Sequence, residues 1–384
     1  MKEKKTMPRH VLTGILCLVV AAALIVVLGL EFTSAWEEEP IYAGPGVTEV
    51  KMLSDYFDGL EGTAGDTEIY VLDSGKPGAS MLVLGGTHPN EPSGVMTAVT
   101  LIEYCQPTEG VLYVIPRADN SAFTCTDPGE AAPMQYYIET AGGTRWFRFG
   151  SRATNPVHQW PDNETYVLKQ FNQTLSGGET RNLNRAYPGN PNGTLTEKIA
   201  YGIVSLIKAE QIDISVDLHE ASPEYTTVNA IVAHEKALEL ANLSLWEVED
   251  SFDLTVEASP TNLHGLSHRE LGDFTDTLSL LMETANASQG RIHGAIDSEL
   301  VVSGEDEFYA RAYEYGALNV DYSAGAISLD VRTGRHLICL VEFCNNYMGE
   351  DGSCIDLGDM PSFDEFVENG IGHYLMAPQP GDEA

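Results

Sequence analysis

The chain has 384 residues, which suffices for one large domain or two domains of ordinary size. Its apolar share of 43% is typical of a folded globular protein and argues against a disordered one. The formal net charge of −36 argues against nucleic acid and anionic membrane surfaces as partners of the body of the protein, because like charges repel.

The N-terminal segment differs from this acidic average. Its basic residues are Lys2, Lys4, Lys5 and Arg9. Residues 11–30 carry no charge, and a helix of that length, rising about 1.5 Å per residue, spans a hydrocarbon core of about 30 Å. We predict a basic cytoplasmic end over residues 1–10 and a transmembrane anchor over residues 11–30, with the remaining chain outside the cytoplasm. The alternative is a cleaved signal peptide and a secreted protein, although the apolar region of a signal peptide usually has about 7–15 residues.

Residues 31–65 are acidic and rich in glycine, and we predict that they form a tether. Three strands are expected next, at "TEIYVLDSG", "SMLVLGG" and "VLYVIPRAD", because each is a short apolar run. A helix is expected at "EPSGVMTAVTLIEYC", whose apolar residues have helical spacing. Residues 121–180 show no clear period, which indicates a long irregular loop region.

The second half of the chain continues the alternation of strands and helices. Helices are expected at "TLTEKIAYGIVSLIKAEQ" and "EKALELANLSLWEVEDSF", and strands at "IDISVDLHEA", "VNAIVAH" and the start of "LSLLMETANASQG". One more helix-strand unit is expected at "RHLICLVEFCNNY". This order predicts a three-layer α/β/α fold around a central mixed, mainly parallel sheet. We expect the catalytic domain over residues 66–300 and a C-terminal extension packed on it over residues 301–384.

Two polar motifs follow predicted buried strands, where α/β sheets bind their ligands. "GGTHPNEPSG" places His88 and Glu91 three residues apart at the start of a helix, so both can face one point. "SVDLHEA" adds His219 at the end of another strand. Alone, each motif could be an ordinary turn or a hydrogen-bonded histidine. Together they predict one zinc site, because two histidines and one glutamate leave a coordination position for a zinc-activated water.

A third motif, "ETRNLNRAYPGNPNG", contains Asn184 and Arg185 before a Pro-Gly turn. The guanidinium group of arginine can bind a carboxylate with two parallel hydrogen bonds, and asparagine adds a neutral donor. On spacing alone, a solvated loop with a capping asparagine is an equal alternative.

The chain also resembles a known family. "GGTHPNE", "RNLNRAYPG", "DLHE" and "METANASQG" occur in the order found in the succinylglutamate desuccinylase and aspartoacylase branch of the carboxypeptidase A-like zinc hydrolases. The resemblance runs from about residue 68 to residue 291. It implies three ligands for one zinc ion, two residues that bind the substrate carboxylate, and one catalytic glutamate. The implied zinc ligands are His88, Glu91 and His219. The implied carboxylate-binding residues are Asn184 and Arg185. The implied catalytic glutamate is Glu283, upstream of Gln289 and Gly290.

The resemblance further implies an arginine that stabilises the oxyanion, upstream of the Asn-Arg pair. The arginines in that part of the chain are Arg117, Arg145, Arg148, Arg152 and Arg181. We predict Arg145, in "GGTRWFRFGSR", with Arg148 as the next choice. The alternative is a basic loop that balances an acidic protein. Glu342, in "LICLVEFCNN", is a rival for the catalytic base because it also follows an apolar run that we interpret as a strand.

These features predict a membrane-anchored, extracytoplasmic zinc hydrolase that cleaves an amide bond of a small-molecule or peptide substrate with a free carboxylate. The resemblance favours an N-acyl amino acid deacylase with a zinc-activated water and a glutamate general base. A metallocarboxypeptidase acting on peptides or cell-wall peptides is the alternative. An inactive anchored binding module is a second alternative, and the intact set of ligands and base argues against it.

Overall fold

In the computed structural model, which describes residues 7–127, 129, 131–248 and 254–382, one sheet of eight strands has the order β1-β2-β4-β3-β9-β12-β10-β11. Its strands are β1 (Glu49–Met52), β2 (Glu68–Asp73), β3 (Ser80–Leu84), β4 (Val111–Ile115), β9 (Ile214–Ala221), β10 (Ala230–Ala233), β11 (Thr255–Ala258) and β12 (Leu278–Ala285). The central strands β4, β3, β9 and β12 run parallel, as do β10 and β11, and the other neighbours pair antiparallel. The predicted mixed, mainly parallel sheet is therefore confirmed.

The central strands are apolar on both faces because helices cover both faces. Val216 and Leu218 of β9 belong to one hydrophobic core, whereas Leu82 and Leu84 of β3 belong to the other. Every residue of β9 is buried, although its sequence alternates apolar residues with Ser215, Asp217 and His219. The two cores lie on opposite sides of one sheet. Because both faces of the sheet are packed, the strands are rigid and hold the polar residues at their ends in place.

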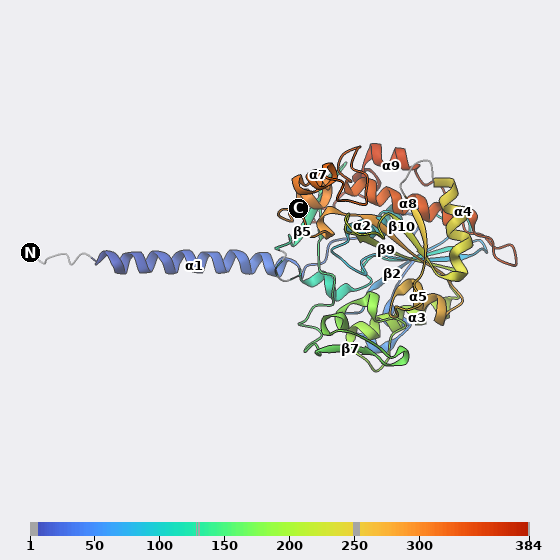
Figure 1. Cartoon of the computed structure of the whole chain (residues 1–384), viewed down its shortest axis with the longest axis horizontal. Helices are drawn as coiled ribbons and strands as arrows, with labels where there is room; N and C mark the ends of the chain where they lie inside the picture. The colour runs from blue at the N-terminus through green and yellow to red at the C-terminus, as the bar shows by residue number, and fades with distance from the viewer. Residues whose placement is uncertain (1–6, 128, 130, 249–253, 383–384) are drawn as a thin grey trace, which may run out of the picture.

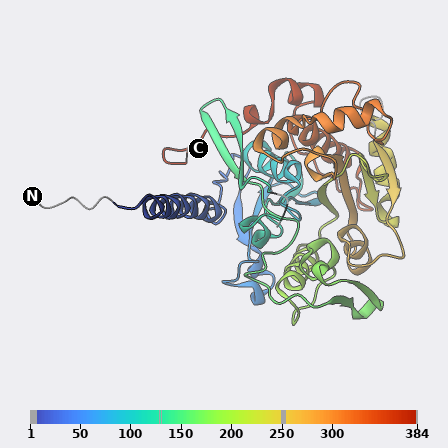
Figure 2. The ribbon, with the colours of Figure 1, turned by 60° about the vertical axis from the view of Figure 1, so that its left-hand side comes forward.

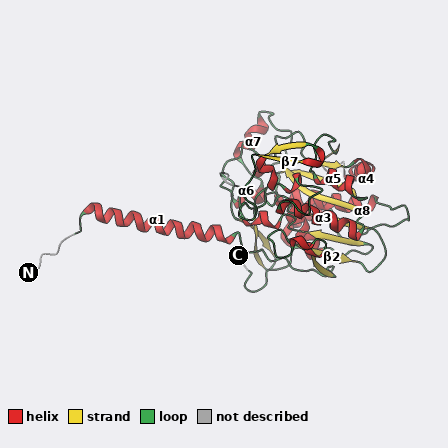
Figure 3. Cartoon of the chain, turned by 90° about the horizontal axis from the view of Figure 1, so that it is seen from below, coloured by secondary structure: helices red, strands yellow, loops and turns green. Residues whose placement is uncertain are grey.

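Helices form the two outer layers, above and below the sheet in Figure 1, and Figure 3 colours the helices red and the strands yellow. One face is covered by α2 (Pro92–Tyr104), α4 (Leu238–Val248) and α8 (Leu329–Asn346), and the other by α3 (Leu195–Glu210) and α5 (Ser267–Phe274). The three-layer α/β/α prediction is thus confirmed. Thr194 caps α3, in a capping box with Glu197. The predicted end of the α4 segment, residues 249–253, lies outside the described residues.

Shorter helices complete the chain. They are α6 (Ser298–Ser303), α7 (Glu307–Glu314), α9 (Phe363–Asn369) and α10 (Ile371–Tyr374). The 3-10 turns are η1 (Leu53–Asp55), η2 (Asp58–Leu60), η3 (Asn120–Thr124), η4 (Lys169–Phe171), η5 (Gly177–Arg181), η6 (Leu183–Arg185), η7 (Glu235–Ala237) and η8 (Ala287–Gln289).

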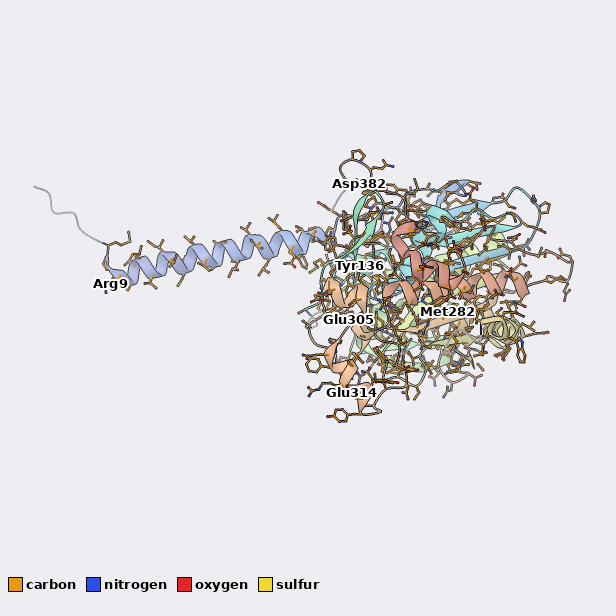
Figure 4. All side chains as sticks on the ribbon, turned by 90° about the horizontal axis from the view of Figure 1, so that it is seen from above. Arg9, Tyr136, Met282, Glu305, Glu314 and Asp382 are labelled. Carbon is orange, nitrogen blue, oxygen red and sulfur yellow. The ribbon has the colours of Figure 1, made fainter. Side chains whose placement is uncertain are left out.

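The N-terminal helix α1 (Arg9–Ser34) projects from the body, and none of its residues is buried. Figure 4 shows its side chains, from Arg9 onward, standing clear of the rest of the protein. Within the described ranges it is the one helix long and apolar enough to cross a membrane, by length and composition. Lys2, Lys4 and Lys5 of the predicted basic end lie outside the described residues.

Residues 31–65 differ from the predicted tether, because much of this segment packs on the body. The edge strand β1 pairs antiparallel with β2, and Leu53 and Leu60 are buried in the core that contains α3. Glu39 is also buried and pairs with Arg148. The acidic composition suggested a solvated segment, but some of these acids serve as partners of buried arginines.

Residues 121–180 are also more regular than the sequence indicated. They contain two hairpins, β5 (Gln135–Thr140) with β6 (Gly143–Arg148), and β7 (Thr165–Leu168) with β8 (Gln173–Ser176). Figure 2 shows the β5-β6 hairpin at the edge of the body, near the C-terminus. Each hairpin is a separate two-stranded sheet, and the buried side chains of β6 include two arginines, so its sequence shows no regular apolar alternation.

The prediction of a strand within "RHLICLVEFCNNY" was wrong, because these residues belong to helix α8. Leu337, Leu340, Phe343 and Cys344 are buried, and their spacing follows the helical repeat. A short apolar run such as "LICLV" does not distinguish a strand from a buried helix. Glu342 therefore lies on a helix in an outer layer and does not follow a strand of the sheet.

Candidate metal centre and substrate cavity

The candidate ligands come together at the carboxyl ends of two neighbouring strands. His88 lies in the turn after β3, Glu91 is the residue before α2, and His219 is part of β9. Nδ1 of His88 lies 2.8 Å from Oε1 of Glu91, and Nδ1 of His219 lies 2.8 Å from Oε2 of the same carboxylate. One donor atom from each residue falls within 4.8 Å of the others, and all three residues are buried. The group could therefore hold one metal ion.

The second nitrogen of each histidine is also engaged. Nε2 of His88 lies 2.9 Å from Oδ1 of Asn182, and Nε2 of His219 lies 2.9 Å from Oδ2 of Asp217. Asp217 is itself fixed, because the hydroxyl groups of Thr87 and Ser267 donate to it at 2.7 and 2.5 Å. Outer partners of this kind orient metal-binding histidines, and here they direct both Nδ1 atoms to Glu91.

The charges at this site favour a bound cation. Burial opposes a charge on His219, yet the carboxylates of Asp217 and Glu91 together raise its pKa well above the ordinary value. Burial would likewise raise the pKa of Glu91, but His88 and His219 lower it well below its usual range. The two buried carboxylates thus favour a positive charge at His219, and a metal ion would supply such a charge. Two imidazole nitrogens and a carboxylate suit zinc, so the donors present fit that ion.

A second group of side chains that could bind a metal already has a cation beside it. The group consists of His234, Glu235 and Asp273. Arg269 forms ion pairs with both acids, at 2.9 Å to Glu235 and 2.7 Å to Asp273. A guanidinium group already supplies the positive charge there, so we assign no metal to this group.

Glu283 lies beside the candidate ligands. It is the register partner of His219 across the parallel pair β12-β9, so both side chains project from the same face. Burial raises the pKa of Glu283 to about 8; His219 and Arg152 oppose this shift, and Glu91 and Asp217 add to it. Its Oε2 has no hydrogen-bond partner in the described part of the chain. A buried carboxyl group with a raised pKa and an unused oxygen can exchange a proton near neutral pH.

These residues open into one cavity of about 460 Å³. Arg152, Asn184 and Arg185 line it together with the three candidate ligands and Glu283. The structure therefore brings together all the predicted site residues except Arg145. The cavity has the size of a small-molecule site and lies where α/β sheets place their ligands.

Arg145, the predicted oxyanion arginine, lies elsewhere. Arg145 belongs to strand β6, and its side chain is 1% exposed. Its Nη1 donates to the carboxylate of Glu103 at 2.7 Å. Arg148, the next choice, pairs with the buried Glu39. Both arginines neutralise buried carboxylates, so neither guanidinium reaches the cavity and the choice of Arg145 was wrong.

Of the five arginines considered in the sequence, Arg152 is the one that lies at a candidate metal ligand. Its Nη1 donates to Oε1 of Glu91 at 3.2 Å, and its side chain is 45% exposed. Arg117 and Arg181 are paired with Glu68 and Asp162 instead. The sequence signal for Arg152 was only its place in "GSRATNP" upstream of the Asn-Arg pair, which it shared with four other arginines.

Asn184 and Arg185 are held by short contacts at the cavity wall. Oδ1 of Asn184 accepts the backbone N–H of Ser267 at 2.8 Å, which leaves the amide NH₂ as its donor group. Nη1 of Arg185 donates to the carbonyl oxygen of Asn184 at 2.6 Å. Burial, and then the positive charge of Arg152, lower the pKa of Arg185 from its ordinary value. Two guanidinium groups this close favour an anionic ligand between them.

Glu342, the rival base, is separated from the cavity and lines a different surface hollow together with residues of α9. Tyr187 is fully buried in a hydrophobic core, whereas Tyr225 lines the cavity and is 47% exposed.

Comparisons with known proteins gave matches among solved structures alone: no protein-family model and no curated protein matches the chain. The succinylglutamate desuccinylase of Silicibacter sp. TM1040 is 16% identical, with a TM-score of 0.39 over 77% of this chain and 63% of that chain. A metallo-carboxypeptidase from Burkholderia cenocepacia is 11% identical, with a TM-score of 0.39 over 63% of this chain and 56% of that chain. The cell shape determinant protein Csd4 of Helicobacter pylori is 11% identical, with a TM-score of 0.41 over 76% and 55%.

The chain spans less than two thirds of the length of each of the three, between 55% and 63%. The activity and substrate of this chain are therefore argued below from its own residues.

Proposed function

We propose that the protein is a zinc-dependent hydrolase that cleaves an amide bond of a carboxylate-bearing substrate, as an N-acyl amino acid deacylase. One observation carries the proposal. Nδ1 of His88, Nδ1 of His219 and the Glu91 carboxylate converge within 4.8 Å, and Glu283 lies beside them in the same cavity. Ligands, base and cationic groups occur together there, which favours an enzyme over an anchored binding module.

His88, Glu91 and His219 would hold the zinc ion, which when bound would polarise the scissile carbonyl and acidify the attacking water. Glu283 would take the proton of that water on its unused Oε2 and deliver it to the leaving amine. Arg152 would stabilise the negative charge that develops on the carbonyl oxygen, because its guanidinium group lies at the ligand Glu91.

Arg185 and the NH₂ group of Asn184 would bind the free carboxylate of the substrate. Arg185 is 20% exposed and lies close enough to Arg152 for the two charges to interact. A carboxylate bound between them would relieve that repulsion and fix the scissile amide over Glu283. This arrangement suits the carboxylate of an amino acid, whether it leaves from an acyl group or from a peptide.

The exposed apolar helix α1 supports a membrane anchor, with the globular body on the extracytoplasmic side as the basic residues before it predict. Such a location would suit a peptide substrate as well as an acylated amino acid. The metallocarboxypeptidase alternative is therefore included in the test.

The test measures amine release by the full-length, zinc-loaded protein in detergent micelles. The substrates are N-acyl amino acids, peptides with free C-termini and the same peptides with amidated C-termini. We expect release from N-acyl amino acids, and none after removal of zinc with a chelator. Cleavage confined to peptides with a free C-terminus would replace the deacylase by a carboxypeptidase. No release from any substrate by protein with zinc bound would contradict the proposed function.

A further inference from the structure

Glu257 is an acidic residue of the cavity that the proposed reaction does not use. It lies on β11, where it is the register partner of Val232 on β10, and Val232 is in turn the partner of Leu281 on β12. Leu281 and Glu283 are two residues apart on one strand, so their side chains share a face. The register therefore places Glu257 on the same face of the sheet as the proposed catalytic base, and it lines the same cavity.

The acids of the cavity differ in their partners. Glu91 contacts both histidines and Arg152, and Glu220 forms a buried ion pair with Arg332 at 3.1 Å. Glu257 accepts one hydrogen bond, from the hydroxyl group of Thr227 at 3.0 Å. Among the residues that the structure describes, no cation forms an ion pair with Glu257. Its charge thus remains available to a ligand in the cavity.

The cavity that Glu257 shares with the carboxylate-binding residues has an apolar wall. Pro260, Leu263 and Leu266 line the cavity, as do Val232 and Leu281 of the sheet. Apolar side chains of this kind pack against the methylene groups of a long amino acid side chain.

The segment that begins at Glu257 contacts the backbone around Arg185 at its other end, near Gly265. The carbonyl oxygen of Gly265 accepts the backbone N–H of Tyr187 at 3.2 Å, and the backbone N–H of Ser267 donates to Asn184. Gly265 lies so close to the backbone of Arg185 that an added Cβ would fall 2.3 Å from its carbonyl oxygen, and its φ is +92°. Backbone contacts therefore join the apolar wall to the carboxylate-binding residues at one end, while its other end follows Glu257.

We infer that the cavity selects an amino acid with a cationic side chain as the leaving group of the reaction. The carboxylate would bind Arg185 and Asn184, the aliphatic part of the side chain would lie along the apolar wall, and the terminal ammonium or guanidinium group would pair with Glu257. This inference rests on the carboxylate-binding role of Arg185 in the proposed function and adds the class of amino acid. A charged partner fits Glu257 better than a neutral one because a hydrogen bond between ionised groups is the stronger kind.

The test measures binding of free amino acids, which requires no turnover. The probes are L-lysine, L-norleucine and L-glutamate, added to the full-length zinc-loaded protein in micelles and followed by isothermal titration calorimetry. We expect lysine to bind about tenfold more tightly than norleucine, which has no charged group on its side chain, and glutamate to bind most weakly. Glu257→Gln should reduce the lysine-to-norleucine ratio to about one without weakening norleucine.

Two further variants separate charge from structure. Glu257→Asp keeps the carboxylate and should retain a preference for lysine. Glu247→Gln removes the same charge from an exposed position of α4 outside the cavity, and should leave the ratio unchanged. Arg185→Gln should weaken all three amino acids alike.

Equal affinities for lysine and norleucine, no measurable binding of lysine, or an unchanged ratio in Glu257→Gln would each overturn the inference. These results differ from a failure of the proposed function, which appears as absent amine release. An enzyme that releases amines from several acylated amino acids but binds lysine and norleucine equally would remain a hydrolase without a basic subsite.

Discussion

Glu283 and His219 are register partners on adjacent parallel strands, so the proposed base and a proposed metal ligand project side by side from one face of the sheet. Two strands of a rigid sheet fix their separation, and the cavity opens directly over them. Glu283 therefore lies beside the residues that would hold the metal, where it could accept the proton of the reacting water. This arrangement leads to the predictions that follow.

Replacing Glu283 with Gln should lower kcat for amine release by about 10²–10⁴-fold, because the amide cannot accept the proton of the attacking water. The metal content should remain that of the unchanged protein, since Glu283 is not one of the proposed ligands. Glu342→Gln is the matched control, because Glu342 lies on α8 outside the cavity. Full activity of Glu283→Gln, or an equal loss in both variants, would show that the base is another residue.

Arg152 should support catalysis, whereas Arg145 should support the stability of the fold. Arg152→Met should lower kcat by about 10²–10³-fold with little change in the melting temperature, because the residue is partly exposed at the cavity. Arg145→Met should instead destabilise the fold by about 3–5 kcal/mol, since it leaves the buried carboxylate of Glu103 without its cation. Steady-state kinetics and thermal melting of both variants check this. Loss of kcat in a fully folded Arg145→Met protein would restore the original prediction.

The ion pair of Arg332 and Glu220 connects α8 to the candidate metal centre. Both side chains are fully buried, and the backbone N–H of Glu220 donates to Oε2 of Glu91 at 3.0 Å. Arg332→Met should lower the free energy of unfolding by about 3–5 kcal/mol, because it leaves the Glu220 carboxylate uncompensated. Adding Glu220→Gln should recover part of that loss. Thermal melting of the single and double variants measures the coupling, and additive losses would argue against a linked pair.

Asp119 should make stability depend on pH. Burial raises the pKa of Asp119 to about 7, compared with about 3.9 in an unfolded chain. Between these values the unfolded chain has lost the proton that the folded protein keeps, so the folded state becomes less stable as the pH rises, by up to about 1.4 kcal/mol per pH unit. Above pH 7 both states are ionised and the effect is constant.

Asp119→Asn removes this titration and can keep the hydrogen bonds to Ala122 and Thr154. The stability of the variant relative to the unchanged protein should therefore increase from pH 4 to pH 7 by up to about 4 kcal/mol and then stay level. Denaturant unfolding of both proteins across this range measures the difference. A difference that does not change with pH would show that Asp119 has an ordinary pKa.

Motifs at strand ends could be predicted from the sequence because local order decides their position. A buried strand followed by "GGTHPNE" places His88 and Glu91 at the carboxyl end of that strand. His219 and Glu283 follow from the same argument, since β9 has apolar residues at alternate positions and β12 begins with an apolar run. The layered fold could be predicted for the same reason.

The choice among the arginines could not be made from the sequence, because it depends on tertiary pairing. Glu103 lies on α2 and Glu39 precedes the sheet, and only the folded chain shows that they take Arg145 and Arg148. Glu257 was missed because its strand, β11, has four residues and no apolar run. The helix α8 was missed because its apolar run is short enough to fit a strand.

The metal content of the purified protein tests the proposed centre most directly. Full-length protein, dialysed against zinc and then against metal-free buffer, should retain one zinc ion per chain. Inductively coupled plasma mass spectrometry measures this zinc content. His219→Ala should lose most of this zinc, whereas His373→Ala, at an exposed position of α10, should retain it. A chain without bound zinc, or equal zinc in the two variants, would contradict a metal centre formed by His88, Glu91 and His219.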